Sequence, residues 1–304
     1  MEFKFLIDEV YLSSLFTKIE DNNPEIEWFS NLQSNIPARL GTIFITRDLL
    51  SKTFNGICNA DIFYPTKNKE RDLAMKFHLA QRMFYRTYSA SDYAHANSHS
   101  AEEDFPTFIL NNNGVSLITK LNYESEAWWS NNMFINKYSM GDSAIECIRT
   151  IISNYTNCPE DEFETVVPIL FPNIYVHWSN KIRLQNFNIS PIPMEWVVKS
   201  LSYLNDSAVE DYRRNPGEFM DEALKKGISL SPESTKTRRA GRMMREREID
   251  IDGTCVCCEW HFKYSKTNGG RIHFHFGYDV DVKTKTKTLG NPIVGIFVQH
   301  LSIK

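Results

Sequence analysis

The spacing of apolar residues predicts both strands and helices in this chain. An alternating pattern in residues 2–5 and a β-branched run in residues 41–46 predict strands, the second of them buried. In residues 71–88 the apolar positions recur every three or four residues, which is the period of a helix. Residues 193–204 show the same period. We therefore expect a mixed α+β fold.

Capping residues predict where two further helices begin or end. Ser143 and Glu146 have the spacing of a capping box, which predicts a helix that starts directly after Ser143. Asn215 and Pro216 predict the start of another helix, and Gly227 predicts its end.

Residues 89–118 combine a polar loop with a hairpin. The small polar residues 89–104 show no periodicity and predict a loop. His95 and His99 lie four apart in this loop, but the segment is poor in helix formers, so we interpret them as ordinary loop histidines and not as metal ligands. Residues 111–114, Asn-Asn-Asn-Gly between two apolar runs, predict a hairpin turn.

The last fifty residues predict an antiparallel sheet of three strands. We expect these strands at residues 254–264, 271–280 and 292–301, with turns at 265–270 and 281–291. A three-residue loop at 268–270 keeps apolar side chains opposite apolar ones, and it pairs Lys263 with His275.

This register gathers polar side chains on one face of the sheet. They are Glu259, His261, Lys263, Arg271, His273 and His275, with Gln299 or His300 arriving from the third strand. Histidine transfers protons near neutral pH, and Lys or Arg stabilises charge on phosphate. We therefore interpret the histidines as acid and base, Lys263 and Arg271 as phosphate ligands, and Glu259 as the group that orients a histidine. Because RNA carries its own nucleophile, the 2′-hydroxyl, such a face needs neither a metal nor a cofactor.

Two other interpretations of this face stay open. Antiparallel sheets commonly have one solvated polar face without any chemistry. Alternatively, Cys255, Cys258, His273 and His275 are residue types that bind zinc. Residues 255 and 258 fall on opposite faces of a regular strand, however, so a zinc site there requires a local knuckle.

The composition is that of a globular protein in a reducing compartment. Hydrophobic residues make up 42% and charged residues 24% of the 304 residues. No apolar run approaches the roughly 20 residues that a membrane helix needs. The six cysteines, in a long chain without a secretion signal, are most simply free thiols. We therefore expect a cytoplasmic protein that does not bind a membrane.

The charge is distributed unevenly. Residues 224–304 contain 15 Lys and Arg against 8 Asp and Glu, whereas the remaining residues contain 19 against 30. This asymmetry favours two domains, an acidic α+β body at residues 1–229 and a basic module at residues 230–304. The module begins with a basic arm whose cations suit a nucleic-acid backbone. They are Lys236, Arg238, Arg239, Arg242, Arg245 and Arg247.

The C-terminal segment resembles the β-sheet core of RelE-type ribonuclease toxins. The similarity lies in residues 260–263 (Trp-His-Phe-Lys), 271–274 (Arg-Ile-His-Phe) and 298–301 (Val-Gln-His-Leu). It covers about fifty residues, and this chain is about three times as long as those toxins. The resemblance therefore implies a ribonuclease-like module inside a larger protein, as in bacterial phage defence, controlled by an operon-encoded partner such as an ATPase or an antitoxin.

These observations lead to two hypotheses for the function. The first is a metal-independent endoribonuclease that uses the polar sheet face and holds RNA with the basic arm. The second is a non-enzymatic subunit of a defence complex, which binds nucleic acid or a partner protein and does not use the histidines.

Overall fold

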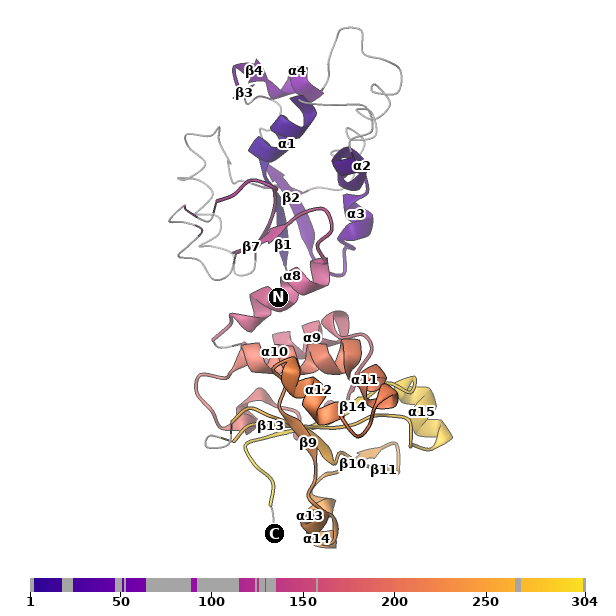
Figure 1. Ribbon diagram of the computed structural model, residues 1–304. Coiled ribbons are helices and arrows are strands. Elements are labelled where there is room, and N and C mark those ends of the chain that lie inside the picture. Colours follow the sequence, from indigo (N-terminus) through magenta and orange to yellow (C-terminus); the bar gives the residue numbers. More distant parts are fainter. Residues whose placement is uncertain are drawn as a thin grey trace. The chain divides into compact units, whose positions relative to one another are not determined.

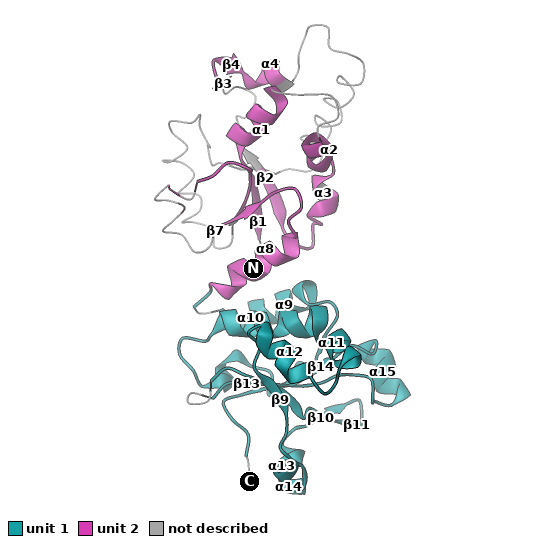
Figure 2. Cartoon of the chain, in the orientation of Figure 1, with its two compact units in different colours: residues 1, 155–304 teal, residues 2–154 magenta. Residues whose placement is uncertain are grey.

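The computed structural model divides the chain into two compact units, residues 2–154 and residues 155–304 (Figure 2). It describes residues 3–17, 24–46, 51, 53–63, 89–91, 115–123, 125, 129, 135–156, 158–265 and 269–302. Helices and sheets occur in both units, so the mixed α+β class expected from the sequence is confirmed.

The N-terminal unit is built on a five-stranded sheet in which every pairing is parallel (Figure 1). Its strands are β1 (Lys4–Ile7), β2 (Thr42–Thr46), β5 (Ser89–Ser91), β6 (Val115–Ile118) and β7 (Ile135–Tyr138). The order is β5-β2-β1-β6-β7, so the chain first builds outward on one side of β1 and then on the other. Phe5, Leu6 and Leu117 are fully buried, as expected for a parallel sheet that is covered on both faces.

Short helices and one small hairpin complete the described part of this unit. They are α1 (Glu9–Thr17), α2 (Pro24–Ser30), α3 (Leu32–Asn35), α4 (Asn59–Phe63), α8 (Ala144–Ser153), β3 (Thr53–Phe54) and β4 (Ile57–Cys58). The helix start predicted at Ser143 is confirmed, because the Ser143 hydroxyl accepts a hydrogen bond from the Glu146 backbone at the start of α8. The Glu146 carboxylate pairs with Arg149.

Several expected features lie outside the described residues. These are the helix at 71–88, most of the loop at 89–104 with His95 and His99, and the turn at 111–114. The strand after that turn, β6, pairs in parallel with both β1 and β7, so neither of its edges is open to the antiparallel partner that the expected hairpin requires.

The C-terminal unit is built on a second five-stranded sheet, of order β8-β14-β13-β12-β9. Its strands are β8 (Tyr175–Val176), β9 (Leu230–Pro232), β12 (Trp260–Lys263), β13 (Arg271–His275) and β14 (Ile293–Val298). The pairing of β8 with β14 is parallel, and the others are antiparallel.

Helices between residues 160 and 225 cover one face of this sheet, whereas a hairpin and two short helices of residues 235–245 lie on the other side (Figure 1). The helical segments are α9 (Glu160–Leu170), the 3-10 turn at Leu184–Phe187, α10 (Met194–Tyr203), the π turn at Leu204–Ala208, α11 (Val209–Arg214), α12 (Phe219–Lys225), α13 (Thr235–Arg238), α14 (Gly241–Arg245) and α15 (Val282–Thr288). Aromatic rings fill the helical side: Phe187 stacks on Phe297 with ring centroids 5.0 Å apart, and Phe262 stacks on Phe274 at 4.9 Å. The helix expected at 193–204 is confirmed.

The domain boundary expected at residue 229 is wrong. Strand β8 precedes that position and β9 follows it, yet both belong to one sheet. Charge composition suggested the boundary, but β9 pairs with β12 and makes the start of the basic arm an edge strand. The two units divide after residue 154 instead.

The single strand expected at 254–264 is broken into two. Its first part, β11 (Thr254–Cys257), folds back on β10 (Glu248–Ile251) as a separate hairpin. The turn of this hairpin contains Asp252 and Gly253, both at positive φ. Strand β12 starts only at Trp260.

The expected register between β12 and β13 is wrong by four residues. Lys263 lies opposite Arg271, and His261 lies opposite His273. The hairpin loop closes earlier than expected, since the Ser265 backbone donates to Gly269. Because the error is an even number of residues, each side chain stays on its expected face.

Residues 283–288, which we expected in a turn, lie in helix α15. Asp281 caps this helix, because its carboxylate accepts hydrogen bonds from the backbone of Lys283 and Thr284.

The β10–β11 hairpin covers the second face of the sheet with apolar side chains. The cluster between them consists of Ile249, Ile251, Val256 and Cys258 on the hairpin side and Ile293 and Ile296 on β14. Gly295 lies unpaired in a bulge of β14 at this contact. A Cβ at Gly295 would lie 2.6 Å from the Cys258 sulfur and 3.0 Å from Ile249 Cδ1, so the hairpin approaches the strand as closely as glycine allows.

We predict that Gly295→Ala lowers the free energy of unfolding by about 1–3 kcal/mol, because the added methyl group overpacks this contact. Urea unfolding of the full chain measures the loss, and faster hydrogen exchange in residues 248–258 locates it. Gly241→Ala is the matched control, since a Cβ there meets nothing within 4 Å. An equal stability of the two variants would contradict the close packing of the hairpin.

Candidate functional site

The expected polar face of the C-terminal sheet exists, and two cross-strand pairs form its centre. His261 lies opposite His273, with ring centroids 4.9 Å apart, and Lys263 lies opposite Arg271. The alternation of β12 and β13 therefore brings these four residues together as the sequence predicted.

This face is not solvated, which removes one of the open interpretations. His273 is 1% exposed and His261 is 8% exposed, and Arg271 is also buried. The apolar hairpin covers the side of β13 and β14, while Glu233 and Arg247 lie over β12.

Arg247 is not available for nucleic acid, contrary to our expectation. The side chain is 1% exposed, and its Nε donates to Glu233 Oε1 at 2.7 Å. Its other guanidinium nitrogens donate to the backbone carbonyls of Met243 and Ser302. A buried cation requires such pairing, so Arg247 joins the end of β9, helix α14 and the C-terminal segment.

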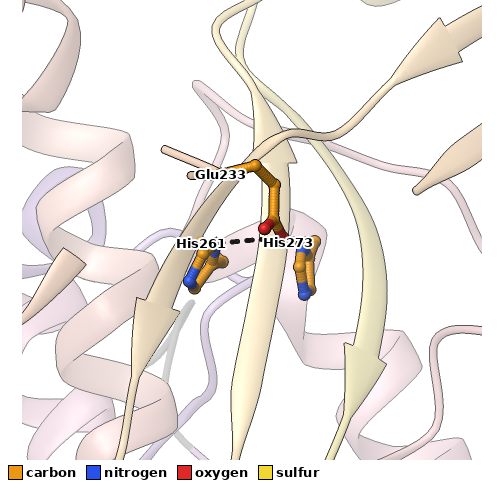
Figure 3. Close-up of side chains that lie close together, drawn as sticks. All are labelled: Glu233, His261 and His273. Atoms are coloured by element: carbon orange, nitrogen blue, oxygen red, sulfur yellow. Dashed lines mark ion pairs between the residues drawn. The ribbon is translucent and has the colours of Figure 1, made fainter. Parts of the chain in front are cut away.

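Glu233 is a site residue that the sequence analysis missed. Its carboxylate approaches both imidazoles, and Oε1 lies 3.7 Å from His261 Nδ1 (Figure 3). In the sequence, Glu233 stands in a segment that looks like a helix cap. The cap exists, but Ser234 forms it by accepting a hydrogen bond from the Thr237 backbone. This cap turns the chain directly after β9 and leaves Glu233 on the covered face.

Burial makes the histidines of this face poor proton carriers near neutral pH. It lowers the pKa of His261 to about 3, and the charges of Lys263 and Arg271 act in the same direction. The backbone carbonyl of Glu259 has the opposite effect and raises this pKa. Burial also holds the pKa of His273 well below its usual range. Both imidazoles are therefore neutral at pH 7, the form that accepts a proton or binds a metal.

Two other expected site residues are engaged elsewhere. The Glu259 carboxylate forms a two-pronged ion pair with Arg238, with both N–O distances 3.1 Å, so it orients no histidine. His275 Nδ1 accepts a hydrogen bond from the backbone of Gly277, which fixes its ring in the turn after β13.

The third strand does not add a polar group to the face. Strand β14 ends at Val298, so Gln299 and His300 lie beyond it and are exposed. The β14 residue opposite His273 is Ile296.

The rest of the basic arm forms an exposed surface on two short helices. Lys236, Arg238, Arg239, Arg242 and Arg245 are all exposed on or beside α13 and α14. Only Arg238 of these five forms an ion pair with another residue of the described chain.

The cysteines that suggested a zinc site are not brought together with the histidines. Cys255 is exposed, whereas Cys258 is fully buried in the apolar cluster. Within the described ranges, one group of three or more His, Cys, Asp and Glu side chains has ligand atoms close enough for a metal: Glu233, His261 and His273, whose atoms lie within 4.8 Å of one another.

The N-terminal unit has a second polar cluster where its strand order reverses, which is where open parallel sheets bind ligands. Asp8 follows β1 and is completely buried. It accepts hydrogen bonds from the Thr119 and Tyr123 hydroxyls and from the backbone of Val10 and Tyr11. These four bonds cap α1 and tie β1 to the chain after β6, so they account for Asp8 structurally.

Comparison with known proteins finds no relative of this chain, since no family model, curated protein or solved structure matches it. No helix in the described ranges is both long and apolar enough to cross a membrane.

The buried histidines predict a loss of stability in acid. Because their pKa values are lowered by folding, the unfolded chain binds more protons below pH about 6.5, and stability falls as the pH falls. Between pH 7 and pH 5 we expect a loss on the order of 1–2 kcal/mol for each imidazole. Urea unfolding in the presence of EDTA measures it.

In this experiment, His273→Gln should flatten the pH dependence, whereas His300→Gln, at an exposed position, should leave it unchanged. A wild-type stability that is equal at pH 7 and pH 5 would argue against buried neutral imidazoles.

Proposed function

We propose that the C-terminal unit binds the phosphate backbone of nucleic acid through the basic surface of α13 and α14. The observation that carries the proposal is the exposure of five cations within ten residues, with no acidic residue among them. They are Lys236, Arg238, Arg239, Arg242 and Arg245.

The backbone under this surface is held in place, which favours binding of an extended anion. Ser234 caps α13, Thr237 is buried beneath it, and Arg247 binds the carbonyl of Met243 in α14. The arginines therefore project from a fixed base, and guanidinium groups match phosphate oxygens in pairs. The Arg238–Glu259 pair shows this two-pronged geometry with a carboxylate.

RNA is the proposed ligand class, because the C-terminal segment resembles RelE-type ribonuclease toxins. In the same proposal the protein is a cytoplasmic component of a defence complex, with an operon-encoded partner such as an ATPase or an antitoxin.

Metal-independent cleavage of RNA is a second candidate function. It is favoured by the adjacent pairs His261–His273 and Lys263–Arg271, which place two imidazoles next to two cations. Both imidazoles are neutral and covered, so cleavage by this pair requires the cover to open. RNA cut by the purified chain in EDTA, and left intact by His273→Ala, would support it; RNA left intact by the wild type would exclude it under those conditions.

The basic surface predicts salt-dependent binding that depends on specific arginines. We expect Arg239→Ala/Arg242→Ala to weaken binding of single-stranded RNA about tenfold, and to reduce the slope of log K against log salt by about 1.4, because two phosphate contacts are lost. Fluorescence anisotropy with labelled RNA between about 50 and 200 mM salt measures both quantities.

The matched control is Lys283→Ala/Lys285→Ala, which removes the same charge from exposed positions of α15. It should bind RNA nearly as well as the wild type. If both double variants lost the same affinity, the effect would come from total charge, and the proposed surface would be wrong.

A further inference from the structure

Glu233, His261 and His273 converge on the covered face of the C-terminal sheet. Their ligand atoms lie within 4.8 Å of one another, and all three residues are buried (Figure 3). Such a group is costly to bury unless its polar atoms are matched by partners.

One polar atom of His261, Nδ1, lacks such a partner. Its side chain is about nine-tenths buried, and its Nδ1 forms no hydrogen bond although it is shielded from solvent. The nearest carboxylate oxygen, Glu233 Oε1, is 3.7 Å away. This distance is too long for a hydrogen bond but suits two ligands of one ion.

His273 has one ring nitrogen, Nε2, with a lone pair that a metal can use. Its Nδ1 lies 3.2 Å from the backbone carbonyl of Cys258, which can only accept a hydrogen bond. The proton therefore sits on Nδ1, and Nε2 carries a free lone pair. Metal-binding histidines commonly have this arrangement, with the other ring nitrogen donating to a carbonyl.

Arg247 orients the Glu233 carboxylate and also adds a positive charge next to the site. Its Nε donates to Glu233 Oε1, and its two other contacts fix the guanidinium. The positive charge of Arg247 disfavours the binding of a cation. The two imidazoles are neutral, however, so they can bind a cation without first releasing a proton.

We propose that Glu233, His261 and His273 form a binding site for a divalent transition-metal ion, with zinc the best match to two imidazoles and one carboxylate. Zinc bonds of about 2.0–2.1 Å in tetrahedral geometry place ligand atoms roughly 3.4 Å apart. Glu233 Oε1 and His261 Nδ1, at 3.7 Å, are close to this spacing, whereas the other ligand atoms, which lie within 4.8 Å of one another, must move closer. Three protein ligands leave a fourth position for water or for an oxygen of a bound anion.

The site is independent of nucleic-acid binding at α13 and α14, but it competes with proton transfer. A histidine that binds zinc cannot also act as acid or base, so the metal site and metal-independent cleavage are alternatives for His261 and His273.

The test uses the full chain without RNA, stripped with EDTA, dialysed, and titrated with zinc by calorimetry. We expect one zinc per chain and a melting temperature that rises with zinc concentration. Glu233→Gln and His261→Gln should each weaken binding at least tenfold, whereas His275→Gln, outside the group, should not. Absence of stoichiometric binding to the folded wild type would overturn the proposal, whatever the variants do.

Cysteine provides the necessary second control. Cys255→Ser/Cys257→Ser should bind zinc as the wild type does, since these thiols lie outside the group. Loss of binding in this variant, with binding retained in His261→Gln, would assign zinc to the thiols and reject the proposed site. Tighter binding of Mg²⁺ than of Zn²⁺ would also reject it, because magnesium prefers oxygen ligands.

Discussion

The buried ion pair between Arg247 and Glu233 is the interaction on which the second face of the C-terminal sheet depends. One guanidinium contacts the end of β9, the carbonyl of Met243 in α14, and the carbonyl of Ser302 near the chain end. Breaking a buried pair by removing one partner typically costs about 3–5 kcal/mol, because the other charge is left without a partner. The pair thus closes the segment between β9 and β10 into a loop.

This closure sorts the basic residues of the segment into two groups with different chemistry. Arg247 is committed to the interior, whereas Arg239, Arg242 and Arg245 face solvent on the same loop. The same cover removes water from His261 and His273 and lowers both pKa values. Burial therefore changes these histidines from proton carriers into neutral ligands, and the ligand function suits them better than the acid–base function inferred from their residue type.

The sequence predicted the faces of the C-terminal strands correctly but not what covers them. Alternation determines which side chains share a face, and a register error of an even number of residues does not change this result. His261 and His273 were therefore correctly predicted on the same face. Whether a polar face meets water depends on a distant segment. The hairpin that supplies the cover does leave a signal, because Ile249 and Ile251 alternate before the Asp-Gly turn at 252–253.

The domain boundary and Glu233 could not be read from the sequence for a related reason. Charge composition describes the charged residues of a segment, whereas a domain boundary depends on which segments pack together. The strand that follows the expected boundary, β9, has only three residues, which is too short for a periodic pattern. Glu233 follows this strand and becomes a site residue only because Ser234 turns the chain at that point.

The two ion pairs of the basic loop explain how a surface function and a buried site coexist on one segment. Arg238 and Glu259 are partly exposed, so a phosphate can replace the carboxylate at little cost in free energy. Arg247 and Glu233 are buried, and water cannot compensate either charge if they separate. An anion that binds at α13 and α14 therefore replaces Glu259 as the partner of Arg238 and leaves the Arg247–Glu233 pair intact. The Arg247–Glu233 pair then keeps the Glu233 carboxylate beside His261 and His273 whether or not nucleic acid is bound.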